Sequence, residues 1–448
     1  MAELLIAPTA TRRERRRRLR LLFLLPFPPR LDALHGGGKV GAQLLDQLAT
    51  RHEVGVMYLR ARLEPPIDDL IAARCAHVLE VSRPWTRPAP VDQLVRIARL
   101  ALSLPRRRPM WATDHYSPRF GPRLRQLAAE WQPDIVQAEM HIMGQYFAYL
   151  ADPDARPSQR VLVEHELGSQ AAPYLKRSLP LAGQWLARLD KAAWRTFEGR
   201  VIAASHAVVV FTQHDYAALA PVLGQTPAFV VPFGSPIPRQ AADPGGISPP
   251  CTLFVGNFLH PPNIDGALWL ARDIFPLLQD EFPAHKLLIV GDQPPPVLTQ
   301  LASAHIIVTG RVPDIWPYLE SAAIIAAPLR SGGGMRVKVL EALAAGKAIV
   351  ATTLATHGLA ITSGDQLALA DTGADFARSI AELLRDPARR MAMARRARVW
   401  AEGHLPWPTS VEAYEAIYDR LLTKRANQNA QPSLREGPGG AAEARAHE

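Results

Sequence analysis

The sequence predicts two doubly wound α/β domains that face each other across a cleft. Three observations lead to this prediction. Residues 21–59 show the pattern of a strand, a glycine-containing loop, a helix and a second strand, which begins a parallel sheet with a right-handed crossover. A second alternation of strands and helices starts at residue 251. Between the two alternations, the proline- and glycine-rich stretch 238–250 is typical of a linker.

In the first domain, the apolar run LLFLL at 21–25 predicts a buried strand. The segment His35-Gly36-Gly37-Gly38 predicts a loop, and residues 39–50 carry the apolar spacing of a helix. Further strands are predicted at 52–59, 135–138, 161–165, 207–211 and 229–231. Ligands of open α/β sheets bind beyond the carboxyl ends of the strands, so we expect functional residues in the loops that follow strands.

In the second domain, strands are predicted at 251–256, 286–290, 306–309, 323–327 and 348–351. Helices are predicted at 265–278, 312–319, 337–345 and 374–384. A terminal helix begins near Trp407, and beyond residue 422 the apolar periodicity is lost. We therefore expect residues 425–448 to be a disordered tail.

Composition excludes several classes of protein. Hydrophobic residues make up 48% and charged residues 21% of the 448 positions, which is ordinary for a globular chain. Two cysteines, Cys75 and Cys251, exclude a disulfide scaffold and a cysteine-built metal site, and they suit a reducing cytoplasm. The apolar run before Pro26 is too short for a spanning helix and lacks a cleavage site, so we interpret it as a strand and not as a signal peptide.

The net charge of +9 is concentrated in two zones. Residues 1–20 hold seven arginines against two glutamates, and residues 81–125 hold ten arginines against two aspartates. This unevenness argues against a nucleic-acid-binding protein and favours a local anionic partner such as a membrane surface. The alternatives, a solvated disordered tail at 1–18 and a solvated arginine face, remain open.

The strongest local pattern is PLRSGGGMRVKVLEALAAG at 328–346. A strand ends before three glycines, and a helix begins after them; the glycines are Gly332, Gly333 and Gly334. The helix N-terminus favours an anion, and Arg336 and Lys338 add two positive charges that the helix dipole alone disfavours. A bound diphosphate explains this placement.

One turn further on, Glu341 is placed to accept from a hydroxyl group bound above the loop, such as that of a ribose. The alternative is a plain helix start in which Lys338 and Glu341 form a surface ion pair. No arrangement of a serine–histidine–aspartate triad or of metal ligands stands out, so the pattern indicates group transfer from a nucleotide.

The segment GGGMRVKVLEALAAGKAIVAT resembles the donor-binding signature of glycosyltransferase family 4, whose members are retaining enzymes of the GT-B fold. The resemblance continues upstream through LFVGNFLHPPNIDGALWLARDIFPLL, LLIVGDQPP and VTGRVPDIWPYLESAAIIAAPL, and so covers most of the second domain. The first domain matches more loosely through PFPPRLDALHGGGKVGAQLLDQLATRHEV, DIVQAEMH and VLVEHE.

The resemblance implies a domain order and a set of site residues. It implies an acceptor-binding Rossmann-like domain at 19–240, a nucleotide-sugar-binding domain at 241–404 and a helix at 405–424 that crosses back to the first domain. Donor-binding candidates are Gly36, Gly37, Gly38, Asn257, Asn263, Gly310, Arg311, Val312, Gly332, Gly333, Gly334, Met335 and Glu341. Catalytic candidates are His165, Arg336 and Lys338, and acceptor-side candidates are Glu139 and His141.

Two positions depart from the family's pattern. The family's signature has another glutamate eight residues before Glu341, where this chain has Gly333. The basic residues that the family often uses for the diphosphate are missing between Asn257 and Asn263, so Arg336 and Lys338 are expected to take their place. These departures leave the donor sugar open.

The resulting expectation is a retaining glycosyltransferase that needs no metal and no cofactor. It would move a sugar from a nucleoside-diphosphate sugar to a lipid-linked or polysaccharide acceptor in surface glycan synthesis, in the cytoplasm or at the inner face of the membrane. Two alternatives are a non-catalytic nucleotide-sugar-binding protein and another GT-B enzyme such as a nucleotide-sugar epimerase.

Overall fold

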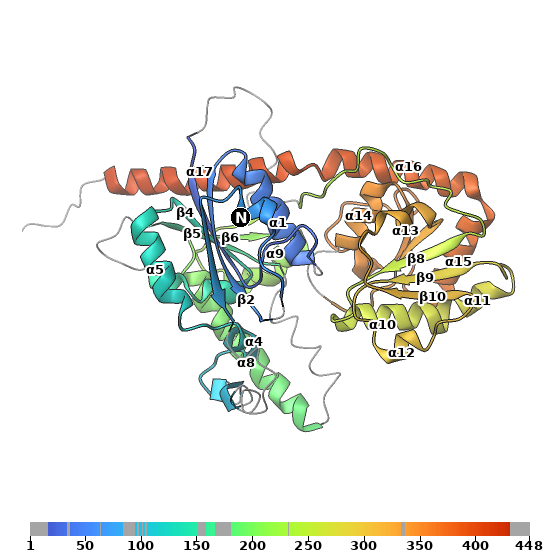
Figure 1. The fold of residues 1–448 in the computed structure, drawn as a ribbon, viewed down its shortest axis with the longest axis horizontal. Coiled ribbons are helices and arrows are strands. Elements are labelled where there is room, and N and C mark those ends of the chain that lie inside the picture. Colours follow the sequence, from blue (N-terminus) through green and yellow to red (C-terminus); the bar gives the residue numbers. More distant parts are fainter. Residues whose placement is uncertain are drawn as a thin grey trace, which may run out of the picture.

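The chain forms two α/β domains, each built around a parallel sheet, and its last two described helices lie one against each domain (Figure 1). The structure is a computed structural model. It describes residues 17–33, 36–62, 64–83, 95, 98–100, 102–103, 105–150, 158–165, 181–231, 233–332 and 337–430.

The N-terminal sheet has seven parallel strands in the order β3-β2-β1-β4-β5-β6-β7. The strands are β1 (Arg20–Leu25), β2 (Glu53–Arg60), β3 (His77–Ser82), β4 (Ile135–Glu139), β5 (Gln159–Val163), β6 (Ala207–Val210) and β7 (Ala228–Val230). The order reverses between β1 and β4, which makes the sheet doubly wound. This reversal positions the loops after β1 and β4 at the same edge of the sheet.

Strand β1 is apolar throughout because both of its faces are covered. Leu21 and Phe23 pack into one core and Leu22 and Leu24 into another, on opposite faces of the sheet. A strand of a parallel sheet that is buried on both faces reads as a continuous apolar run, as LLFLL does. The described helical segments of this domain are α1 (Gly36–Ala49), α2 (Asp69–Ala72), α4 (Met110–Asp114), α5 (Phe120–Trp131), α6 (His141–Gly144), η1 (Phe147–Leu150), α8 (Leu181–Ala203), α9 (Gln213–Leu219) and η2 (Ala220–Val222).

The C-terminal sheet has six parallel strands in the order β10-β9-β8-β11-β12-β13, again with a reversal, here between β8 and β11. The strands are β8 (Cys251–Val255), β9 (Lys286–Val290), β10 (Ile306–Gly310), β11 (Ile324–Ala327), β12 (Ala348–Ala351) and β13 (Ala368–Leu369). The helical segments are α10 (Pro261–Trp269), η3 (Leu270–Ile274), α11 (Pro276–Gln279), α12 (Pro296–Thr299), α13 (Trp316–Ser321), α14 (Val337–Ala345), η4 (Thr353–Thr356), α15 (Gly373–Arg385) and α16 (Pro387–His404). The predicted two-domain, doubly wound α/β architecture is confirmed.

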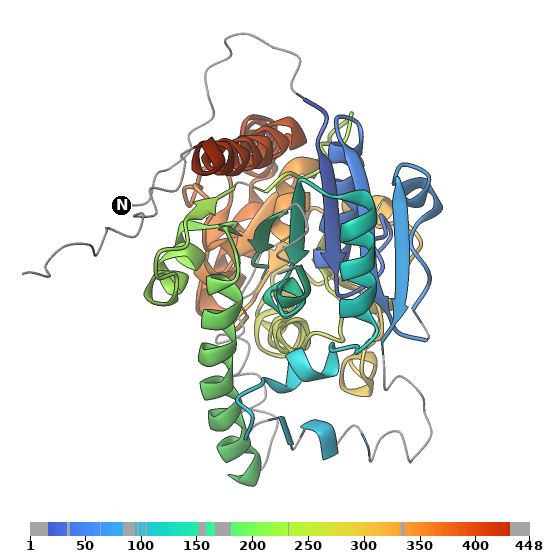
Figure 2. The ribbon, with the colours of Figure 1, turned by 90° about the vertical axis from the view of Figure 1, so that its left-hand side faces the viewer.

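The last helix, α17 (Trp407–Ala430), returns to the N-terminal domain and packs against α1 (Figures 1 and 2). Glu415 on α17 lies 3.2 Å from the imidazole Nε2 of His52 and 3.2 Å from the guanidinium of Arg51. The expectation of a disordered tail from residue 425 was wrong for its first residues, because the helix continues to Ala430.

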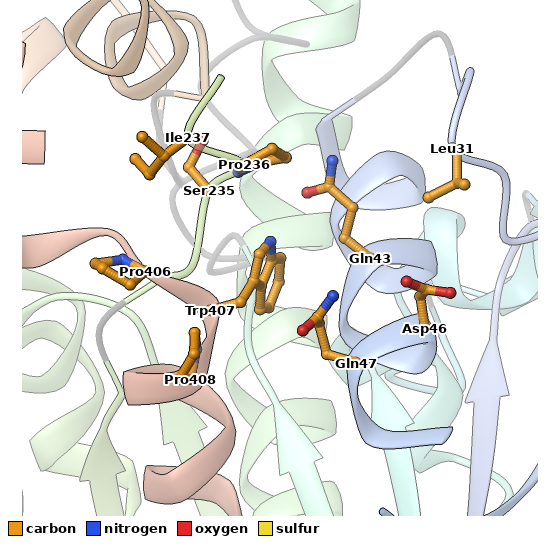
Figure 3. Close-up of a pocket in the computed structure, with 10 residues that line it drawn as sticks. All are labelled: Leu31, Gln43, Asp46, Gln47, Ser235, Pro236, Ile237, Pro406, Trp407 and Pro408. Carbon is orange, nitrogen blue, oxygen red and sulfur yellow. The ribbon is translucent and has the colours of Figure 1, made fainter. Parts of the chain in front are cut away.

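The chain passes between the domains twice, near Ser235 and near Leu405, and these two segments contact each other. The backbone N–H of Ser235 donates to the carbonyl of Leu405 at 2.9 Å, and Phe233 contacts the ring of Trp407. Gly234 lies directly against the same ring. Beside this junction is a groove of about 460 Å³ between α1 and the two segments (Figure 3).

Several predicted boundaries differ from the structure for local reasons. Gly36–Gly38 form the first turn of α1 and not a loop. Helix α13 begins at Trp316 and not at 312, because Pro317 favours a first turn and Asp314 accepts from the N–H of Trp316. Helix α10 begins at Pro261, four residues before the predicted start, since prolines are tolerated at the first helical positions.

Candidate functional site

A cleft of about 1540 Å³ lies between the two domains and is lined by residues of both. On the N-terminal side the lining comes from the segments after β1, β2 and β3, from α1 and α4, and from the loops after β4 and β5. On the C-terminal side it comes from the loops after β8, β9, β10 and β11 and from α14. The two places where the strand order reverses therefore open into the same cleft, as expected for ligand sites of doubly wound sheets.

On the N-terminal side, the structure places His165 in the cleft wall. Its Nε2 lies 2.6 Å from Oε2 of Glu139, and its ring contacts Phe211 edge-on with 5.2 Å between centroids. Glu139 is the last residue of β4, is 2% exposed and does not itself line the cleft. The structure thus brings the two predicted residues together, with Glu139 acting on His165.

The predicted acceptor-side residue His141 lies elsewhere. It is 1% exposed, its Nδ1 lies 2.6 Å from Oε2 of Glu164, and its ring packs against Trp194 and Trp111. It does not line the cleft. Its burial and these contacts favour a structural role.

The glycines at the start of α1 bring helix backbone close to His165. A Cβ on Gly37 would lie 3.2 Å from Cε of Met140 and 3.7 Å from Nδ1 of His165. Gly37 lines the cleft, whereas Gly38 does not. His35 lies outside the described residues.

On the C-terminal side, Lys338 in the first turn of α14 points into the cleft lining. Its Nζ donates to Oδ1 of Asn263 at 2.6 Å and lies 4.5 Å from the ring centroid of Phe254. The amide of Asn263 donates in turn to the carbonyl of Asn257 at 2.7 Å. Asn263 thus holds the ammonium group of Lys338 in the cleft wall.

Asn257 also lines the cleft, but its side-chain oxygen accepts from the N–H of Leu259 at 2.9 Å and stabilises the turn after β8. This is the structural interpretation that the sequence left open for an asparagine in a turn. The backbone of this turn, including Gly256, forms part of the cleft floor.

Glu341 of α14 forms an ion pair with Lys39 of α1 across the cleft. The two side chains are 28% and 31% exposed, and both line the cleft. Sequence reasoning missed Lys39, although its place directly after the glycine run could have indicated it.

Arg311 and Val312 line the cleft after β10, and Gly310 ends that strand with a φ of +73°. Across the cleft, the pKa of Asp32 is lowered mainly by its hydrogen bond with Arg30, and Arg311 adds to this effect. Arg311 therefore faces the segment after β1, and its charge is opposed by a carboxylate of the other domain.

The glycine-rich segment before α14 is described only in part. Gly332 is half-buried with a φ of +116°. Gly333, Gly334, Met335 and Arg336 lie outside the described residues, so their predicted roles are carried by the sequence alone.

Sequence reasoning also missed residues at the N-terminal end of the cleft. Met140 lines it with a φ of +69°, an uncommon conformation for a residue other than glycine and one that occurs at functional sites. Arg83 and His115 line it as well, with Nη1 of Arg83 2.9 Å from Nε2 of His115. No sequence pattern marks these three residues, because they come from separate loops.

Within the described part of the chain, no three histidine, cysteine, aspartate or glutamate side chains are arranged to hold a metal ion. Among the same residues, every helix is too short or too polar to cross a membrane.

Comparison with known proteins shows which families share parts of this sequence. Residues 249–386 match the family model described as group 1 glycosyl transferases. A Klebsiella pneumoniae protein of 44.6 kDa from the cps region, itself uncharacterized, is 27% identical over 137 residues. That alignment covers 29% of this chain and only 35% of the relative's length.

Solved structures match over nearly the whole chain. Sucrose-phosphate synthase from Thermosynechococcus elongatus aligns with a TM-score of 0.67 at 15% identity, over 90% of this chain and 100% of that one. WaaG, a glycosyltransferase involved in lipopolysaccharide biosynthesis, gives 0.60 at 14% identity over 90% and 99%. Anabaena HepE, in complex with UDP and glucose, gives 0.57 at 15% identity over 93% and 100%. The chain therefore has the two-domain GT-B fold.

Proposed function

We propose that the protein is a retaining glycosyltransferase that moves a sugar from a nucleoside-diphosphate sugar to an acceptor held by the N-terminal domain. The observation that carries this proposal is the pairing of two features across one cleft. Lys338, held by Asn263 at the start of α14, faces His165, fixed by Glu139. The match of residues 249–386 to group 1 glycosyl transferases supports the same conclusion.

The C-terminal side has the chemistry of a diphosphate and ribose site. A helix N-terminus with a cation in its first turn stabilises the negative charge that develops on a diphosphate leaving group. Lys338 supplies that charge, and Arg336 is proposed to add a second. Glu341, one turn along the same helix, is the proposed acceptor for a ribose hydroxyl. With these groups in place, the transfer is proposed to need no metal ion.

The N-terminal side supplies the residue that meets the sugar. His165 is the proposed contact to the transferred sugar, and the leaving phosphate is proposed to take the proton of the acceptor hydroxyl. The sugar would leave the nucleotide and join the acceptor on the same face, which gives retention at the anomeric carbon.

The acceptor is proposed to be lipid-linked or polysaccharide. WaaG acts in lipopolysaccharide biosynthesis, and the Klebsiella relative belongs to a cps region, which supports a role in surface glycan synthesis. HepE holds UDP and glucose in its structure, which supports a nucleoside-diphosphate hexose as donor.

The basic zones at 1–20 and 81–125 are proposed to attach the enzyme to the inner face of the membrane. In the described part of the second zone, Arg106 and Arg107 are exposed and Leu102 is 55% exposed. Exposed arginines beside an exposed leucine suit a membrane surface, which has anionic headgroups above an apolar interior. Sedimentation with vesicles should be stronger for anionic than for neutral lipid and should weaken as salt rises. Equal sedimentation with both would remove this part of the proposal.

Product analysis tests the transfer reaction directly. The protein is incubated with a panel of nucleoside-diphosphate sugars, with and without a short lipid-linked acceptor. Release of the nucleoside diphosphate and an acceptor product with the donor's anomeric configuration is the expected result. Binding without release would favour the non-catalytic alternative that Gly333 motivates, and recovery of an epimeric sugar would favour an epimerase.

A further inference from the structure

A chain of buried hydrogen bonds runs from the C-terminal helix to the cleft histidine. The hydroxyl of Tyr418 on α17 donates to Oε1 of Gln137 at 2.5 Å, and Nε2 of Gln137 donates to Oε1 of Glu139 at 2.6 Å. Oε2 of Glu139 lies 2.6 Å from Nε2 of His165. The first of these bonds spans 281 positions of the sequence, and three bonds in all join Tyr418 to His165.

The chemistry of each group fixes the direction of this chain. A tyrosine hydroxyl that donates to the amide oxygen turns the amide NH₂ of Gln137 toward Glu139. The carboxylate of Glu139 then accepts on both oxygens, so the ring nitrogen beside it has to be the one that carries hydrogen. His165 is thus held with Nε2 protonated, and in the neutral ring Nδ1 is the acceptor.

Burial makes this arrangement rigid. Glu139, Gln137 and Tyr418 are 2%, 1% and 0% exposed, so water does not compete for their hydrogen bonds. Burial raises the pKa of Tyr418 well above its ordinary value, so its hydroxyl stays a donor. The helix itself is held in register by the contacts of Glu415 with Arg51 and His52.

We propose that Tyr418 is a positioning residue, which acts through Gln137 and Glu139 to fix the tautomer and orientation of His165 in the cleft. The inference rests on the proposed transferase function for its consequence on turnover, but the effect on the histidine ring is independent of it. Helix α17 then helps to position a residue of the cleft, in addition to packing against the N-terminal domain.

Helix α17 also provides a matched control. Tyr414 lies one turn earlier, is 2% exposed, and has a hydroxyl for which the described residues supply no hydrogen-bond partner. Tyr418→Phe and Tyr414→Phe therefore remove the same atom from the same helix, and only the first breaks the chain to His165.

The test compares both variants with the full-length protein by two measurements. In protein labelled with ¹⁵N-histidine, the ring-nitrogen signals of His165 are assigned with His165→Asn. Tyr418→Phe should shift them and Tyr414→Phe should leave them unchanged. In the transfer assay, Tyr418→Phe should lower kcat by about three- to tenfold with little change in the KM for donor, since orientation and not donor binding is affected.

Unchanged ring signals in folded Tyr418→Phe would overturn the proposal, and so would an equal response to Tyr414→Phe. If Tyr418→Phe fails to fold, Gln137→Leu breaks the same chain at another point and should give the same shift. A shift of the ring signals in a protein without any transfer activity would overturn the proposed function and leave this inference standing.

Discussion

The ammonium group of Lys39 in α1 pairs with the carboxylate of Glu341 in α14, so an ion pair joins the two domains across the cleft. With both groups about a third exposed, such a pair contributes on the order of 0.2–1 kcal/mol. The ion pair matters more for ligand binding than for stability. Glu341 is the proposed ribose ligand, so Lys39 and the ribose compete for the same carboxylate.

Lys39→Met should therefore tighten the binding of a nucleoside that carries no phosphate, by about 1.5- to 5-fold, because Glu341 is released. Glu341→Gln should weaken it by about tenfold or more, since a charge-assisted hydrogen bond is lost. Calorimetry with the nucleoside whose diphosphate binds best measures both. Weaker nucleoside binding by Lys39→Met would show that Lys39 holds the nucleoside itself.

Lys338→Met should reduce turnover by roughly tenfold to a thousandfold, because one preorganised charge at the leaving group is removed. The stability of the ligand-free protein should change little, because relief of an unfavourable charge near the helix N-terminus offsets the lost contacts with Asn263 and Phe254. Lys191→Met is the control, because Lys191 is an exposed lysine of α8 outside the cleft lining. A Lys338→Met protein with lost stability and full turnover would make this lysine structural.

A chelator should leave turnover unchanged. The helix start of α14 and its cations already neutralise the diphosphate in the proposed mechanism. Assays with and without EDTA, followed by added magnesium or manganese, check this. A strict requirement for either ion would contradict the proposed phosphate site.

The architecture was predictable because its strands are buried on both faces. Strand β12 (Ala348–Ala351) and helix α14 (Val337–Ala345) have the predicted bounds, as each is a short apolar run bordered by glycine or polar residues. Strand β3 was missed because it lies at the sheet edge, and its pattern HVLEVS is mostly half-buried or exposed.

The site was predictable where its residues follow strands or lie in the helix after the glycine run, as Lys338 and Glu341 do. Glu139 and His165 come from adjacent strands whose carboxyl ends lie side by side, so a correct strand order brings them together. Tyr418 and Lys39 reach the site from helices, and their contacts depend on how α17 and the C-terminal domain pack. The spacing of residues in the sequence does not predict that packing.

Acid should destabilise the C-terminal domain through His285. Burial lowers the pKa of His285 to about 4, and the neutral ring fits its partners, the carbonyl of Pro250 at 2.9 Å and the hydroxyl of Thr252 at 3.1 Å. The unfolded chain binds the proton more tightly, so this contribution is present above pH 6.5 and is lost as the pH falls toward 4. The loss amounts to roughly 2–3 kcal/mol.

Denaturant unfolding of this domain at pH 7.5 and pH 4.5 measures that loss. His285→Asn keeps a donor for Pro250 but cannot take up the proton, so its stability should change less between the two pH values. Burial also lowers the pKa of His206 in the N-terminal domain to about 4. The acid-dependent loss of stability in that domain should therefore be the same in His285→Asn as in the unchanged protein. If the free energy of unfolding falls equally between the two pH values in His285→Asn, His285 is not the source of the acid sensitivity.

Gly234→Ala should disturb the junction between the domains. The added Cβ would lie 2.5 Å from the ring of Trp407, closer than any side chain tolerates, so the ring or the crossing segment has to move. We expect a loss of about 1–3 kcal/mol in stability and a changed tryptophan fluorescence. Gly199→Ala on α8 is the control, because its Cβ would meet no atom within 4 Å. Similar effects of the two variants would show that the contact with Trp407 does not matter.

The return of α17 to the N-terminal domain also sets an order of events during synthesis on the ribosome. The N-terminal side of the cleft is completed by residues that are translated after the strands of the C-terminal domain, because Glu415 and Tyr418 follow those strands in the sequence. The last described strand of the C-terminal sheet ends at Leu369, so this domain is able to fold first. His165 reaches its held orientation only after Tyr418 has been added, so a nascent chain arrested before residue 418 should lack a positioned histidine.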